Sequence, residues 1–142
     1  MNKIFIDCDI ILDLLTTRKP HYRHAAQLFS LIETGKTKGY VSPLAFANVH
    51  YVLRKFGSNR KSIMSLNKLN MLVDIIPIDK KVINLALTST FKDFEDAIQY
   101  YTALQHDISH LITRNKKDYK DSDLIICTAE EFLKIWRATS PK

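Results

Sequence analysis

Apolar and polar residues at the start of the chain form a pattern that organises the rest. Residues 4–6 are a short apolar run, as expected for a central parallel strand that is covered on both faces. Asp7 ends this run and Asp9 follows it. Residues 10–15 form a second apolar run in which Asp13 is the only charge. The pattern predicts a buried strand that continues into a helix, with acidic side chains at the junction.

The remaining apolar pattern predicts four further strands and the helices between them. Ser42 and Pro43 form a strong helix start, and Gly57 marks the end of that helix. Strands are expected at 39–41, 73–78, 110–113 and 124–127, and helices at 20–34, 43–56, 59–71, 80–88, 93–104 and 129–136. This order favours an α/β domain with a mostly parallel sheet. One domain is expected over residues 1–142.

Helical spacing also predicts which apolar residues face the core. It places Phe56, Ile63 and Phe94 on the inner faces of their helices. The five histidines show no ligand-like pairing near the acids, so we expect them at surface or helix-side positions: His21, His24, His50, His106 and His110.

Composition excludes several classes of protein. No apolar run approaches the roughly 20 residues that span a bilayer, and no secretory signal pattern is present, so we expect a cytoplasmic protein without a membrane segment. Cys8 and Cys127 lie far apart and form no CxxC pair, which favours buried free thiols over a disulfide or zinc site. The three glycines form no phosphate-binding loop, so P-loop and dinucleotide-binding sites are excluded.

The net charge of +6 indicates a basic surface. Basic surfaces favour polyanions through counterion release, although many basic proteins bind no nucleic acid. Two basic clusters are candidate contacts to a nucleic-acid backbone, or else ordinary solvated charges: Arg18, Lys19 and Arg23 around the start of the second helix, and Arg114, Lys116 and Lys117 after the fourth strand.

Acidic and amide side chains follow the predicted strands or open the next helices. They are Asp7, Asp9, Asn48, Asp93, Glu95, Asp96, Asn115 and Asp118. Right-handed parallel crossovers bring these positions to one edge of the sheet, where the carboxylates repel one another unless a cation lies between them. Mg²⁺ or Mn²⁺ prefers such oxygen ligands, and metal-assisted phosphodiester hydrolysis is the chemistry that fits. The alternative for Asp7, Asp9 and Asp93 is helix capping.

Four stretches in this order resemble the PIN-domain family, whose toxin members are small single-domain ribonucleases paired with antitoxins. FIDCDIILDLL resembles the opening acid motif, YVSPLAFANVHYVL the second-acid helix, DFEDAIQYYTAL the third motif and LITRNKKDY the fourth. The resemblance covers essentially the whole chain. It implies a three-layer PIN-like fold, with a central, mostly parallel five-stranded sheet wrapped by helices, and a divalent metal held by acids.

The resemblance also implies roles for individual residues. Asp7 and Asp96 match the central metal ligands, with Asp93 as a further candidate ligand. Asn48 replaces a frequent glutamate in the second motif, and Asn115 replaces a frequent aspartate after the Thr-Arg pair. Each swap keeps an oxygen ligand but removes one negative charge, so we place both in the catalytic set and Asn115 also among the metal ligands. Candidate supporting acids are Asp9, Glu95 and Asp118.

Three functions are compatible with these residues. The leading hypothesis is a ribonuclease that depends on Mg²⁺ or Mn²⁺ and cleaves RNA phosphodiesters, with a cognate antitoxin and a homodimer or higher homo-oligomer as expected partners. The second is a PIN-type nucleic-acid-binding module with little or no catalysis, motivated by the two asparagines. The third is a phospho-receiver domain, in which Asp79 and Thr113 follow or end strands, although residues 127–129 offer no lysine after the fifth strand.

Overall fold

The centre of the molecule is one five-stranded sheet. The structure is a computed structural model that describes residues 2–119 and 122–139. The strands are β1 (Lys3–Ile6), β2 (Lys38–Val41), β3 (Asp74–Ile75), β4 (His110–Ile112) and β5 (Ile125–Cys127). Their order is β3-β2-β1-β4-β5, and every pairing is parallel. The sheet is therefore entirely parallel, where the sequence predicted a mostly parallel one.

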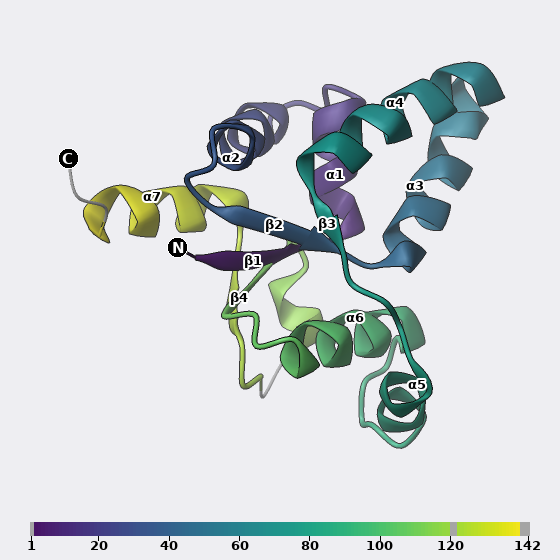
Figure 1. Ribbon diagram of the computed structural model, residues 1–142, viewed down its shortest axis with the longest axis vertical. Coiled ribbons are helices and arrows are strands. Elements are labelled where there is room, and N and C mark those ends of the chain that lie inside the picture. Colours follow the sequence, from purple (N-terminus) through teal and green to yellow (C-terminus); the bar gives the residue numbers. More distant parts are fainter. Residues whose placement is uncertain (1, 120–121, 140–142) are drawn as a thin grey trace.

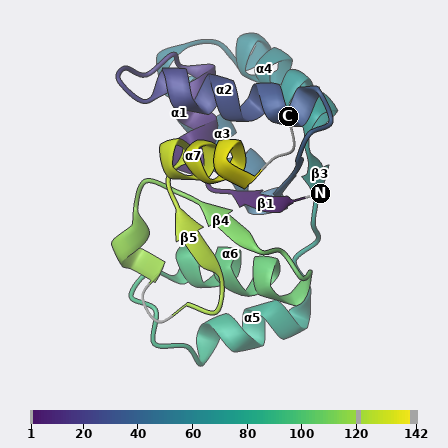
Figure 2. The same cartoon turned by 90° about the vertical axis from the view of Figure 1, so that its left-hand side faces the viewer.

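Helices cover both faces of the sheet and give the predicted three layers. They are α1 (Cys8–Leu15), α2 (Tyr22–Glu33), α3 (Pro43–Phe56), α4 (Asn59–Leu72), α5 (Lys80–Leu87), α6 (Phe94–Gln105) and α7 (Ala129–Thr139), with a 3₁₀ turn η1 (Lys116–Tyr119). In Figure 1, α1 to α4 and α7 lie above the sheet, and α5 and α6 lie below it. Figure 2 shows the same layers from the side, with β4 and β5 facing the viewer.

The central strand β1 explains why its sequence is a continuous apolar run. Ile4 and Ile6 pack into the core formed with α1, α2, α3 and α7, whereas Phe5 packs into the core on the α6 side. All three side chains have no exposed surface. Because β1 is buried on both faces and paired on both edges, the turn that follows it is held firmly in place.

Helix starts follow the predicted capping residues. Ser42 caps α3 with Pro43 in its first turn, and Ser58 caps α4. The side chains of Asp79 and Asp93 accept N–H hydrogen bonds at the starts of α5 and α6. These caps are local interactions within a few residues, so the sequence alone predicts them.

Other local predictions were wrong. Pro20 precedes α2, which begins at Tyr22, and the third strand is only two residues long instead of covering 73–78. Phe56 is 83% exposed, and Ile63 and Phe94 are also exposed. Helical spacing alone does not show which parts of a helix are covered by neighbouring elements.

Two further expectations concern buried residues. His110 lies in β4 and is buried, so the prediction of a surface or helix-side position was wrong for this histidine. Cys8 is half-buried and Cys127 is buried, and both are free thiols as predicted. Within residues 2–119 and 122–139, no helix is long and apolar enough to cross a membrane.

Candidate active site

The junction between β1 and α1 places Asp7 at the carboxyl edge of the sheet. The Asp7 N–H donates to the Ile112 carbonyl of β4 at 3.0 Å, which fixes the backbone. Asp7 Oδ1 accepts from the Cys8 N–H at 2.7 Å, so the predicted capping role is present. Asp7 Oδ2 points the other way and accepts from the Thr113 hydroxyl at 3.0 Å. The carboxylate of Asp7 thus caps a helix with one oxygen and faces the site with the other.

Asp96 reaches the same place from the first turn of α6. The Asp96 N–H donates to Asp93 Oδ1 at 3.0 Å, which fixes the start of this helix. The Tyr119 hydroxyl lies 3.2 Å from Asp7 Oδ2 and 3.3 Å from Asp96 Oδ1. Tyr119 is 3% exposed, so its ring cannot move away easily. One hydroxyl proton serves one carboxylate at a time, and the two acids are therefore held on either side of a single buried phenol.

A cavity of about 260 Å³ brings together most of the predicted site residues. Asp7, Asp9, Asn48, Glu95, Asp96, Asn115 and Arg18 line it. The Asn48 side-chain amide donates to Glu95 Oε2 at 3.0 Å, so the helix of the second motif is linked directly to α6. The parallel topology has gathered residues from β1, α3, α6 and the loop after β4, as the sequence predicted.

Two predicted acids lie on the other side of Asp96. Asp93 and Asp118 line a neighbouring cavity of about 530 Å³ together with Asp96 and Lys117. Neither of these acids lines the cavity of Asp7. Asp93 also uses Oδ1 as the cap of α6. Asp96 is the residue shared by the two cavities.

The carboxylates repel one another strongly. Burial, followed by the charges of Asp93, Asp7 and Asp118, raises the pKa of Asp96 to about 7. Burial and the charge of Asp7 raise the pKa of Asp9 to about 6, against the opposing hydrogen bond from the Arg114 backbone. Burial and the charges of Asp7 and Asp96 raise the pKa of Tyr119. The site therefore favours any cation that neutralises these acids.

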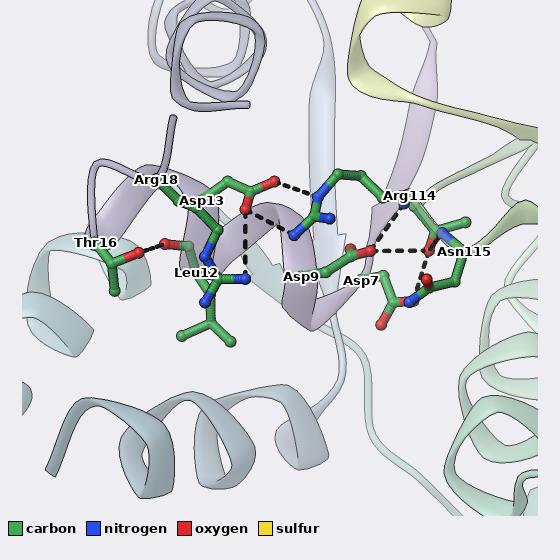
Figure 3. A network of polar contacts seen from close by, with 9 residues as sticks. Asp7, Asp9, Leu12, Asp13, Thr16, Arg18, Arg114 and Asn115 are labelled. Atoms are coloured by element: carbon green, nitrogen blue, oxygen red, sulfur yellow. Dashed lines mark hydrogen bonds and ion pairs between the residues drawn. The ribbon is translucent and has the colours of Figure 1, made fainter. Parts of the chain in front are cut away.

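Asp9 carries an unsatisfied oxygen in this cluster. Its Oδ2 accepts from the Arg114 N–H at 2.9 Å and lies 3.4 Å from the Thr113 hydroxyl. Its Oδ1 is buried and has no hydrogen-bond partner within residues 2–119 and 122–139. A buried acceptor without a donor costs free energy unless another group supplies the missing interaction. Figure 3 shows Asp7 and Asp9 side by side at the end of the loop that carries Arg114 and Asn115.

These residues fit a hard divalent cation with an open coordination sphere. In the part of the chain that the structure describes, no group of three or more His, Cys, Asp or Glu side chains is arranged to hold a metal ion. Mg²⁺ commonly takes only one or two carboxylates and completes its shell with water and substrate phosphate. The carboxylates of Asp7 and Asp96 meet that requirement, with amide oxygens available on Asn48 and Asn115 in the same region.

The predicted basic residues fall into two groups. The Arg114 guanidinium donates to Asp13 at 2.8 and 3.0 Å, and Arg18 lies 3.9 Å from the same carboxylate (Figure 3). Lys116 donates to both oxygens of Glu131 at 3.0 Å. The other three predicted contacts, Lys19, Arg23 and Lys117, are exposed and carry no ion pair among residues 2–119 and 122–139.

The sequence did not identify three important residues of this region. Asp13 is 1% exposed and binds Arg114; the sequence showed it as the only charge in an apolar run but gave it no role. Thr113 and Tyr119 were not predicted to contact Asp7. Their signal was weak, because a polar residue at a strand end and an aromatic residue in a turn are common. Asp79 caps α5 and does not line the cavity of Asp7, so the acid arrangement of a phospho-receiver is not formed.

The fold and the site define an α/β protein whose parallel sheet carries a cluster of carboxylates at its carboxyl edge, and no cationic side chain of the described residues forms an ion pair with Asp7 or Asp96. The sequence model of the PIN domain matches residues 3–117. The chain belongs to the PIN domain family, as its motifs suggested.

Individual relatives cover nearly the whole chain. It is 27% identical over 139 residues to Ribonuclease VapC1 of Aquifex aeolicus (strain VF5), covering 94% of this chain and 95% of that protein. A toxin-antitoxin complex from Klebsiella pneumoniae contains a chain that is 26% identical, with a TM-score of 0.66, covering 89% of this chain and 97% of that one. VapBC-1 from nontypeable Haemophilus influenzae has a chain that is 16% identical, with a TM-score of 0.69, covering 90% and 98%.

Proposed function

We propose that this protein is a divalent-metal-dependent ribonuclease that acts as the toxin of a toxin-antitoxin pair. The observation that carries the proposal is the meeting of Asp7 and Asp96 in one cavity with no cationic side chain bound to either carboxylate among the described residues. The similarity to Ribonuclease VapC1 supports the ribonuclease activity. The similarity to a chain of the Klebsiella toxin-antitoxin complex supports an antitoxin partner.

Each residue of the site would have a separate role in binding the metal ion or the RNA. Asp7 and Asp96 would hold Mg²⁺ or Mn²⁺, while the buried hydroxyls of Thr113 and Tyr119 orient their oxygens. A bound divalent ion supplies a lowered pKa for the attacking water and neutralises charge on the phosphodiester. Arg18 lines the same cavity and can neutralise a phosphate oxygen. Asp93 acts through Asp96, because its side chain fixes the backbone N–H of that residue.

Glu95 compensates for the amide at position 48. The Asn48 side chain donates to Glu95 Oε2 at 3.0 Å, and both residues line the cavity. Glu95 on α6 therefore places a carboxylate beside position 48, where the family often has a glutamate. This arrangement favours catalysis over the alternative of a nucleic-acid-binding module that lacks activity. Asn115 contributes an amide at the cavity wall without adding charge.

The cellular setting follows from the same relationships. RNA is the proposed substrate, and the cytoplasm is the proposed location. A homodimer or higher homo-oligomer is proposed from the family resemblance alone. Contacts to the RNA backbone are proposed for the exposed cations Lys19, Arg23 and Lys117, which have no acidic partner among the described residues.

An RNA cleavage assay tests the proposal. End-labelled single-stranded RNA is incubated with the purified protein in Mg²⁺, in Mn²⁺ and in EDTA. We expect cleavage in either metal and none in EDTA, and RNA affinity that falls with salt because the surface is basic. Cleavage that persists in EDTA contradicts the metal requirement. No cleavage in either metal, combined with salt-dependent RNA binding, would support the binding-module alternative.

A further inference from the structure

A second cavity lies directly beside the acidic site. It has a volume of about 320 Å³, and its lining includes Ile10, Asp13 and Arg114. The acidic cavity is lined by the neighbouring residues Asp9 and Asn115. The two cavities are therefore lined by adjacent residues of α1 and of the loop after β4, so parts of one bound RNA could occupy both.

The second cavity has an apolar floor and flat polar walls, and we refer to it as the histidine pocket. Its floor is formed by Ile10, Ala25 and Ala129, which are at most 5% exposed. The lining also includes His21, His24 and Arg114. Two imidazoles and a guanidinium are planar groups on which an aromatic ring can stack.

Each acidic residue that lines the histidine pocket has a basic side chain close to it. Both oxygens of the Asp13 carboxylate accept hydrogen bonds from Arg114, and Arg18 lies 3.9 Å from the same carboxylate. Glu130 lines the pocket, and its Oε1 lies 3.5 Å from His24 Nε2. Because Arg114 is already paired, the lining offers no unpaired arginine or lysine for a phosphate. A neutral, flat group matches this lining better than an anion.

His24 has an unused hydrogen-bonding position in the same place. Its Nδ1 is buried and has no hydrogen-bond partner among the residues that the structure describes, while its Nε2 lies 3.5 Å from Glu130 Oε1. A ligand that brings a donor or acceptor to Nδ1 would satisfy this atom. Nucleobases combine a stacking face with donors and acceptors at their edges, and unpaired RNA bases are commonly recognised in this way.

We propose that the histidine pocket binds one unpaired nucleobase of the RNA, next to the nucleotide whose phosphate lies in the acidic site. This inference rests on the proposed ribonuclease function and adds a specificity-determining site to it. His21 and Arg114 supply the stacking surfaces, and His24 supplies a hydrogen bond to the base edge.

The test is an abasic scan of a short single-stranded RNA. The cleavage position is first mapped with the wild-type protein, and binding is then measured in the inactive Asp7→Asn background. We expect that removal of the base at one position beside the cleaved bond weakens binding about tenfold, as for loss of a stacked base. After His21→Ala and His24→Ala are added, the same removal should change the affinity by less than about twofold.

Two further variants make the result specific. His24→Phe as a single change leaves the stacking surfaces of His21 and Arg114 in place but loses the ring nitrogen, so it should keep most of the abasic effect while reducing the preference among the four bases. His106→Ala is the matched control, because this exposed histidine at the end of α6 does not line the histidine pocket, and it should keep the full abasic effect.

The outcomes separate this inference from the proposed function. If the wild-type protein cleaves RNA but the abasic profile is flat, or is the same with and without the two pocket histidines, the nucleobase pocket is wrong and the ribonuclease stands. A pocket that holds a protein side chain instead would give that same unchanged profile. If the wild-type protein cleaves no RNA in Mg²⁺ or Mn²⁺, the ribonuclease proposal itself fails.

Discussion

Two buried aspartates at opposite ends of α1 have opposite surroundings. Asp13 is 1% exposed and is neutralised by a two-point contact from Arg114, with Arg18 nearby. Asp7 is 9% exposed and faces hydroxyl groups and other acids, with no cationic side chain bound to it among the described residues. The same residue type on the same helix is thus structural in one place and a candidate metal ligand in the other.

The difference shows that burial alone does not mark a functional carboxylate. A buried carboxylate that accepts two hydrogen bonds from one arginine has its charge neutralised, and the pair holds two segments together. Here it fixes the loop after β4, which carries Asn115 and leads to Tyr119. A buried carboxylate that faces other acids has no opposite charge beside it, and a bound cation would stabilise its ionised form. The paired aspartate supports the geometry of the unpaired one.

The largest expected effect is loss of activity when an unpaired acid is neutralised. Asp7→Asn and Asp96→Asn should each reduce metal-dependent RNA cleavage at least about 100-fold, because each removes a ligand charge. The fold should remain, since asparagine can still cap α1. The melting temperature without metal should stay equal or rise slightly. Cleavage rates and melting curves check this, and full activity of either variant at saturating Mn²⁺ would refute the assignment.

Neutralising the paired acid should instead reduce stability. Asp13→Asn leaves the Arg114 guanidinium without its carboxylate, and breaking a buried ion pair in this way should cost about 2–3 kcal/mol, because Arg114 is partly exposed and can reach water. Urea unfolding measures the change. The matched control is Lys116→Ala, which breaks an exposed pair with Glu131 and should cost less than about 1 kcal/mol. Equal losses in the two variants would contradict the distinction.

The pH dependence of stability sharpens the same comparison. The pKa of Asp96 is raised to about 7 and that of Asp9 to about 6, so these two groups bind more protons in the folded protein than in the unfolded chain between about pH 4 and pH 7. Their contribution to the free energy of unfolding without metal should therefore fall as the pH rises through this window. Asp96→Asn removes one of these groups, so its stability relative to the wild type should increase with pH.

Melting temperatures in EDTA across that pH range provide the measurement. Added Mn²⁺ should restore stability to the wild-type protein at the upper end of the range, because it neutralises the repelling acids. A stability difference between wild type and Asp96→Asn that does not change with pH would show that Asp96 titrates normally.

The smallest effects concern charge at the cavity wall. Asn115→Asp adds one negative charge with almost no change in shape and should tighten Mg²⁺ binding several-fold, on the order of 1 kcal/mol. Glu95→Gln removes a charge and should weaken binding by a similar factor. Calorimetric titrations of both variants, beside cleavage rates at limiting Mg²⁺, test this pair. If neither variant changes metal affinity, these two side chains neither bind the metal ion nor lie close enough for their charge to affect its binding.

The sequence predicted the fold and the acidic edge because both depend on local patterns. Apolar runs, caps such as Ser42 and Asp93, and parallel crossovers are sufficient to place Asp7, Asn48 and Asp96 at one edge of the sheet. The resemblance to the PIN domain, confirmed by the match over 3–117, then gave these residues their predicted roles.

The sequence could not predict the pairing of charges across the molecule. The ion pair of Arg114 with Asp13 and the contacts of Tyr119 with two acids join residues that are far apart in the chain. They depend on side-chain directions that no local pattern encodes. For the same reason Arg114 looked like a free cation in the sequence, and Phe56 looked like a core residue.

Calorimetric titration of Mn²⁺ into the wild-type protein, Asp7→Asn and Asp13→Asn tests the central claim most directly. The claim is that the acids without a paired cation, and not the arginine-paired one, form the metal site. The account predicts one site in the wild-type protein, loss of binding in Asp7→Asn, and binding in Asp13→Asn that is retained at a temperature where this variant is still folded. Unchanged binding in Asp7→Asn, or loss in folded Asp13→Asn with retention in Asp7→Asn, would contradict it.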